Sequence, residues 1–198
     1  MIASNRLLMS RTYDMSLRAR RAAETRNSIT DAAEALLATG AITDATLQAI
    51  AAGAGVSVQT VVRHFGSRNG ILEAVWGRVE ERVLAGRGAI PAGDVDAALT
   101  ALLEHYESEG RLILNLLSQE TIDPDAQEVV RFGRDYHRGW VERCFGPLLS
   151  SGTTEEIDAL VAATDLYVWK LLRLDMGRSP SAARAVMSRL VHAAIGSS

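Results

Sequence analysis

A short run of polar side chains between residues 57 and 68 has the chemistry to bind double-stranded DNA. Gln59 and Arg63 are four residues apart, so they share one face of any helix that contains them. Both can reach base edges in a major groove, where an amide or a guanidinium makes paired hydrogen bonds. Side chains that can donate to phosphate oxygens or neutralise them surround this pair: Ser57, Thr60, His64 and Arg68.

Two helices joined by a tight turn are predicted to position these side chains. Residues 47–65 read LQAIAAGAGVSVQTVVRHF. Ala51 supplies a small residue where the helices cross, Gly55 allows the positive φ of the turn, and Val61 packs the second helix onto the first. The rest of this small core is expected from Ile50, Val56 and Phe65. An ordinary helical hairpin has the same spacing, so the pattern alone leaves both interpretations open.

The wider segment 18–76 resembles the N-terminal domain of the TetR family of transcriptional repressors. The matching residues are Ala32-Ala33, Gly40, Thr46, Ile50-Ala51, Ala54-Gly55-Val56-Ser57, Thr60, His64-Phe65, Arg68 and Ile71-Leu72. The resemblance implies DNA contacts from the polar residues above, from Thr46 and from Val62. Val62 replaces the family's usual tyrosine and can offer a methyl surface to thymine, and Arg68 replaces its usual lysine.

The whole chain is predicted to be all-α. No alternating strand pattern persists, and glycine, proline and capping residues separate about nine helices. Their expected ranges are 17–39, 46–53, 58–65, 68–84, 95–110, 111–119, 124–145, 154–176 and 180–195. The glycine-rich segment 86–93 is the expected linker. It divides a DNA-binding domain with its connecting fourth helix, 17–84, from a helical ligand-binding and dimerisation domain, 94–198.

Composition and charge agree with this division. The chain has 198 residues, 47% of them hydrophobic, and a formal charge of −3. Residues 1–68 carry eight arginines, no lysine and five acidic residues, so an anionic partner is steered to the N-terminal part. The single cysteine, Cys144, excludes an intrachain disulfide. Charges and polar residues interrupt every candidate signal peptide and membrane span, so we expect a cytoplasmic protein without a membrane partner.

The family resemblance implies a homodimer and a small-molecule effector of unknown identity. The last two predicted helices would form the dimer interface, and the two-fold dimer would bind a palindromic operator. Residues that could line an effector pocket in the C-terminal domain are Leu103, Tyr106, Asn115, Leu116, His137, Trp140 and Trp169. For each of them, plain hydrophobic core or a half-exposed helix face is the favoured interpretation over a pocket.

Catalysis and cofactor binding have no support in the sequence. His137 and Cys144 are two helical turns apart, about 10 Å, which is too far for a hydrogen-bonded nucleophile and base. The four histidines lack zinc-ligand spacing, and no nucleotide-binding glycine pattern occurs, so we expect no metal and no cofactor. The predicted function is a ligand-responsive repressor. An activator of the same fold, or a helical ligand carrier that does not bind DNA, are the alternatives.

Overall fold

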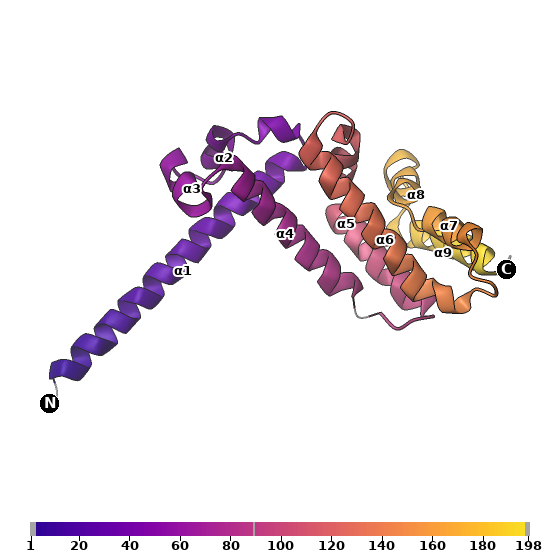
Figure 1. Ribbon diagram of the computed structural model, residues 1–198, viewed down its shortest axis with the longest axis horizontal. Helices are drawn as coiled ribbons and strands as arrows, with labels where there is room; N and C mark the ends of the chain where they lie inside the picture. The colour runs from indigo at the N-terminus through magenta and orange to yellow at the C-terminus, as the bar shows by residue number, and fades with distance from the viewer. Residues whose placement is uncertain (1–2, 89, 197–198) are drawn as a thin grey trace. The chain divides into compact units, whose positions relative to one another are not determined.

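The computed structural model describes residues 3–88 and 90–196, with side chains described from residue 17 onward. These residues are helical and contain no strand, which confirms the predicted all-α class (Figure 1). The α-helices are α1 (Ala3–Leu37), α2 (Leu47–Gly53), α3 (Val58–Phe65), α4 (Arg68–Arg87), α5 (Val95–Gln119), α6 (Pro124–Phe145), α7 (Thr154–Ala163), α8 (Leu166–Lys170) and α9 (Pro180–Gly196). Short helical turns are η1 (Ile42–Asp44), η2 (Gly146–Leu148) and the π-helical η3 (Leu171–Asp175).

The chain forms two compact units, one ending at Gly77 and the other beginning at Arg78. The boundary therefore lies inside α4, whereas the sequence placed it in the linker 86–93. None of the described helices is both long enough and apolar enough to cross a membrane.

The N-terminal unit is built around buried aliphatic side chains from all four of its helices. They are Ile29, Ala33 and Leu37 of α1, Ile50 and Ala51 of α2, Val61 of α3, and Ile71, Leu72 and Val75 of α4. Helix α1 begins at Ala3 and not near residue 17 as predicted, because no glycine or proline interrupts residues 3–37. The side chains of Arg6 and Arg11, two of the eight arginines within residues 1–68, lie outside the described ones.

The C-terminal unit packs α5, α6, α7, α8 and α9 around one aromatic core. Trp140 and Phe145 are fully buried there, with their rings edge to face at 5.6 Å between centroids. Cys144, 3% exposed, belongs to the same core, and burial raises the pKa of its thiol.

Two predicted helix boundaries in this unit are wrong. Gly110 does not end a helix, and α5 runs through it, because glycine is tolerated inside a helix; its missing side chain leaves room for the ring of Trp169. A Cβ at Gly110 would come within 2.6 Å of that ring. Conversely, the predicted helix 154–176 is interrupted where Thr164 ends α7 and Asp165 caps α8, accepting from the amide of Tyr167 at 2.7 Å.

Capping residues mark the start of other helices in this unit. Asp123 accepts from the amides of Asp125 and Ala126 at 2.9 and 3.0 Å at the start of α6. Thr153 and Glu156 form the reciprocal capping box of α7, with distances of 3.3 and 2.8 Å. These local hydrogen bonds fix where each helix begins.

Candidate DNA-binding surface

The turn between α2 and α3 has the geometry that the sequence predicted. Thr46 caps α2 by accepting from the amide of Ala49 at 3.1 Å, and Ser57 caps α3 by accepting from the amide of Thr60 at 3.1 Å. Between them, Gly55 has φ +66°, a conformation that costs little only for glycine. The amide of Val56 then closes the turn on the carbonyl of Ala51 at 3.0 Å.

Helix α3 is fixed to the unit by a single fully buried side chain, Val61. Ile50 and Ala51 of α2 are buried with it, as expected. Val56 and Phe65 are only half-buried, so they flank this small core and do not fill it. The short helix is thus held along one side, and Gln59, Val62 and Arg63 stay exposed on the other.

The opposite side of α3 presents polar and apolar groups to solvent. Gln59 and Arg63 are exposed, and Val62 between them is 40% exposed. Thr60 and His64 are half-buried, and the hydroxyls of Ser57 and Thr60 lie 2.9 Å apart in a mutual hydrogen bond. Side chains with the donors and methyl groups needed to contact DNA therefore share one exposed face.

Arg68 has a role inside the unit that the sequence did not reveal. Its Nε donates to the carbonyl of Ala45 at 3.0 Å and its Nη2 donates to the carbonyl of Ile42. The guanidinium therefore holds the turn after α1 against the start of α4. Its predicted phosphate contact stays a prediction, and it would have to be made by a side chain already engaged with backbone.

Arg26 of α1 is a second positioning residue that sequence reasoning missed. Its guanidinium lies 4.2 Å from the ring centroid of Phe65 and donates to the carbonyl of His64 at 2.8 Å. Both contacts fall on the last turn of α3. In the sequence Arg26 was one of several arginines near the N-terminus, and nothing distinguished it from the others.

Most of the predicted effector residues lie together in the C-terminal core. Leu103, Tyr106, Trp140 and Trp169 are each no more than 8% exposed. The Tyr106 hydroxyl donates to the carbonyl of Thr164 at 3.0 Å, and Trp169 Nε1 donates to Glu107 at 2.9 Å. Asn115 and Leu116 lie further along α5 and are not part of this cluster. The indole and hydroxyl donors are thus used within the fold.

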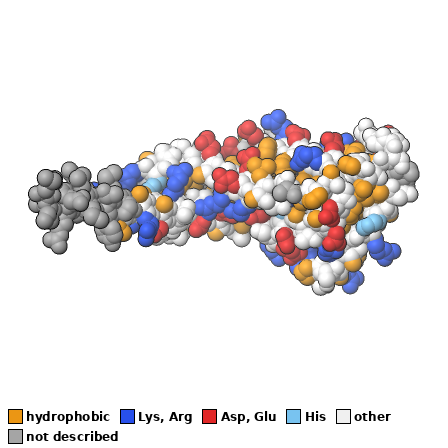
Figure 2. All heavy atoms as spheres, turned by 90° about the horizontal axis from the view of Figure 1, so that it is seen from below, with side chains coloured by type: hydrophobic (Ala, Val, Ile, Leu, Met, Phe, Trp, Pro, Cys, Tyr) orange, Lys and Arg blue, Asp and Glu red, His pale blue; other side chains and the backbone are white. Residues whose placement is uncertain are grey.

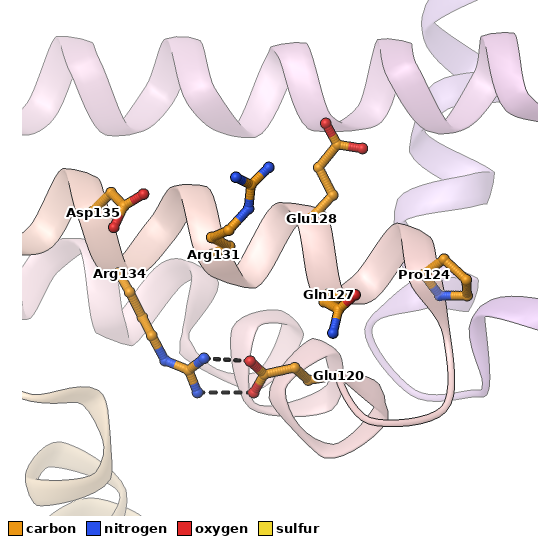
Figure 3. Close-up of a pocket in the computed structure, with 7 residues that line it drawn as sticks. All are labelled: Glu120, Pro124, Gln127, Glu128, Arg131, Arg134 and Asp135. Carbon is orange, nitrogen blue, oxygen red and sulfur yellow. Dashed lines mark hydrogen bonds and ion pairs between the residues drawn. The ribbon is translucent and has the colours of Figure 1, made fainter.

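An open groove of about 540 Å³ lies elsewhere on this unit, at the end of α5 and the start of α6 (Figure 3). Charged side chains line it, among them Arg131, Glu128 and Asp135. Arg134 and Glu120 close one side with a two-pronged ion pair. None of the predicted effector residues lines this groove.

A polar cluster beside Trp140 is the least expected feature of the C-terminal unit. Arg87, at the last turn of α4, is 4% exposed and its Nη2 lies 2.8 Å from Nδ1 of His137. Burial, reinforced by the charge of Arg87, lowers the pKa of His137 to about 3 and that of His105 to about 4. From the sequence, Arg87 falls in the expected linker 86–93, because Gly86 and Gly88 flank it.

A helix-turn-helix with an exposed polar second helix is an arrangement that can place side chains in a major groove of DNA. Residues 29–75 match the family model described as bacterial regulatory proteins, tetR family. This match covers the helix-turn-helix and the helices beside it, and it makes this part of the chain similar to the DNA-binding domain of TetR-family regulators.

Solved structures show the same fold over most of the chain. A TetR-family transcriptional regulator from Streptomyces coelicolor, SCO4454, is 19% identical, with 88% of this chain and 96% of that chain covered and a TM-score of 0.69. A transcriptional regulator from Rhodococcus sp. Rha1 is 16% identical, with coverages of 87% and 96% and a TM-score of 0.68. The multidrug binding protein EbrR, complexed with imidazole, is 21% identical, with coverages of 84% and 89% and a TM-score of 0.55. No curated protein sequence matches this chain.

Proposed function

We propose that the protein is a ligand-responsive repressor that binds a palindromic operator as a homodimer in the cytoplasm. The observation that carries this proposal is the exposed face of α3, where Gln59 and Arg63 lie on either side of a half-exposed Val62. A face of this composition suits the base edges of a major groove. Thr46, Ser57, Thr60 and His64 surround it as candidate phosphate contacts.

Exposed apolar side chains near the C-terminus support the proposed homodimer. Within the predicted helix 154–176, Ile157, Leu160 and Leu172 are buried in the unit's own core, whereas Tyr167 and Leu171 are 54% and 51% exposed. Val186 and Leu190 of α9 are 39% and 42% exposed. Figure 2 shows hydrophobic side chains reaching the surface of the C-terminal unit among charged ones. A second copy of the chain would cover such side chains.

The continuity of α4 supports a response to a ligand. Its first half supplies Ile71, Leu72 and Val75 to the N-terminal core, and its last turn supplies Arg87 to the C-terminal unit. A small molecule that favours one arrangement of the C-terminal unit can act on this helix and change operator affinity. By linkage, the operator would weaken binding of that molecule by the same factor.

Selection of duplexes from a random pool, followed by titration at 50 and 200 mM salt, tests the DNA-binding proposal. We expect a palindrome with half-sites about one helical turn apart, and an affinity that falls by about 10³–10⁵ between the two salt concentrations. Salt-independent binding, or none, would instead favour a ligand carrier. A reporter gene carrying the selected palindrome distinguishes repression from activation.

The dimer is tested by Leu190→Glu, with Ile122→Glu as the matched control because Ile122 is 80% exposed on the α5–α6 turn. We expect light scattering to show monomers for the first variant and dimers for the second. A dimer of unchanged stability in Leu190→Glu would place the interface elsewhere.

A further inference from the structure

The C-terminal unit holds a buried cation that lacks a carboxylate partner. Arg87 is 4% exposed, and among the described residues it forms no ion pair with any aspartate or glutamate. Its guanidinium lies over the ring of Trp140, 4.2 Å from the centroid. Burying an ionised group without a counter-ion is strongly unfavourable, so a chain that keeps one there has a use for it.

His137 does not neutralise Arg87. The hydroxyl of Thr164 donates to the carbonyl of Leu160 at 2.7 Å, so it accepts from Nε2 of His137 at 3.1 Å. This assignment leaves Nδ1 as the acceptor for Arg87 and makes the imidazole neutral. The low pKa of His137 agrees with it.

Two hydrogen-bond donors remain unused at this place. Nε of Arg87 and the hydroxyl of Tyr136 are both buried and have no hydrogen-bond partner. The two residues are in contact, with the guanidinium carbon 5.5 Å from the Tyr136 ring centroid. Tyr136 and His137 are half-buried, so the site lies just beneath the surface of the unit. An acceptor bound here would satisfy both donors.

The charges around the site favour an anion. Glu109, the buried carboxylate of this region, is already paired with Arg82 at 2.8 Å. Arg143 adds a further cation, with its guanidinium carbon 5.9 Å from the Tyr136 ring centroid. His105 lies close enough for Arg87 to lower its pKa, and burial keeps it neutral. The balance of charge near Arg87 is therefore positive.

We propose that Arg87 and Tyr136 bind the carboxylate of a small organic acid, and that this acid is the effector. One unpaired guanidinium and one hydroxyl match the two oxygens of a single carboxylate, whereas a phosphate dianion needs more donors. The half-buried ring of Tyr136 would contact the apolar body of the acid. The inference rests on the proposed ligand response for its regulatory consequence, but the binding site can be tested without DNA.

The binding test uses the full chain with sodium benzoate and sodium hexanoate as probes, measured by calorimetry. At ten times the dissociation constant, we expect the unfolding midpoint to rise by about 3–6 °C. Benzamide, which has the same shape but no charge, and sodium chloride at equal concentration should leave the midpoint unchanged. No shift with either acid, or an equal shift with benzamide, would overturn the proposal.

Three variants locate the site. Arg87→Gln should abolish the benzoate shift, whereas Arg111→Gln, which alters an exposed arginine of α5, should retain it. Tyr136→Phe should weaken benzoate binding about 10-fold without lowering the midpoint of the ligand-free protein, because the hydroxyl it removes has no partner. If Arg87→Gln does not fold, the benzoate affinity of Tyr136→Phe tests the site instead. Unchanged affinity in Tyr136→Phe, or a shift that survives in a folded Arg87→Gln, overturns the assignment.

Operator binding is measured separately on the same samples. We expect benzoate to weaken operator binding by the wild type and by Arg111→Gln, and to leave operator binding by Arg87→Gln unchanged. Operator binding without Arg87-dependent benzoate binding would overturn this inference and leave the proposed DNA-binding function intact. Benzoate binding that depends on Arg87, without any operator binding, would overturn the proposed DNA-binding function and leave the carboxylate site intact.

Discussion

Arginines of the N-terminal unit lie at its surface, where Arg63 is exposed and Arg26 and Arg68 donate to backbone carbonyls. In the C-terminal unit, Arg87 is enclosed by aromatic rings and two neutral histidines lie nearby. The N-terminal unit therefore exposes an arginine at the proposed DNA-binding face, and the C-terminal unit buries one at the proposed effector site. The comparison predicts that substitutions in the two units affect different properties.

The largest effect is expected from Arg63→Ala. A bidentate contact between an arginine and a guanine contributes about 1–3 kcal/mol, and a dimer makes it twice, so affinity for the selected operator should fall by about 10²–10⁴. Affinity for random duplexes should change far less. Fluorescence anisotropy with both duplexes measures this, with Arg111→Ala as the control on the other unit. Equal losses on both duplexes would show that Arg63 contacts only phosphate.

Acid should destabilise the C-terminal unit through its histidines. The pKa of His137 is about 3 and that of His105 about 4 in the folded protein, against about 6.5 when unfolded. The unfolded chain therefore binds more protons between these values, and stability falls as the pH drops below 6.5. We expect a loss of about 2–4 kcal/mol between pH 8 and pH 5 in urea denaturation.

Histidine variants identify the source of that loss. The pH dependence should be smaller in His137→Gln and in His105→Gln, and unchanged in His192→Gln, because His192 is exposed on α9. The same slope in all three variants would mean that other groups cause the acid sensitivity.

Arg68→Ala should lower the stability of the N-terminal unit by about 2 kcal/mol, because two carbonyls lose a charged donor. Arg68→Lys should restore part of it. If Arg68 also contacts phosphate, Arg68→Ala will weaken operator and random duplexes about equally. An unchanged free energy of unfolding in Arg68→Ala would mean that water satisfies the two carbonyls as well as the guanidinium does.

The smallest effect is expected from Arg26→Gln, which removes a hydrogen bond and a cation–π contact at the end of α3. The expected loss is about 1 kcal/mol. Arg20→Gln, at an exposed position of the same helix, is the control and should be neutral. Denaturation curves that coincide for the two variants would show that Arg26 does not position α3.

Features that depend on neighbouring residues were predictable from the sequence. Gly55, the caps at Thr46 and Ser57, and the capping box at Thr153 each act within a few residues of the chain. The display of Gln59 and Arg63 follows from the same local periodicity. The local structure of the candidate DNA-binding surface was therefore largely predictable from the sequence.

Features that depend on distant contacts were not predictable. Gly110 looks like a helix end until the ring of Trp169 is placed against it. Arg87 looks like part of a linker because two glycines flank it, and only tertiary structure shows its burial. Asn115 and Leu116 share the helical spacing of Leu103 and Tyr106, but they lie beyond the core cluster. Spacing alone could not separate these cases.

The lone thiol of Cys144 has a practical consequence. It is 3% exposed in the same core as Trp140, and the chain has no second cysteine. A thiol reagent can therefore react with Cys144 only when the C-terminal unit opens, so the rate of alkylation reports how often that unit opens. Any compound that stabilises the closed form of this unit should lower the alkylation rate of Cys144, whatever the chemistry of the compound and whether or not DNA is present.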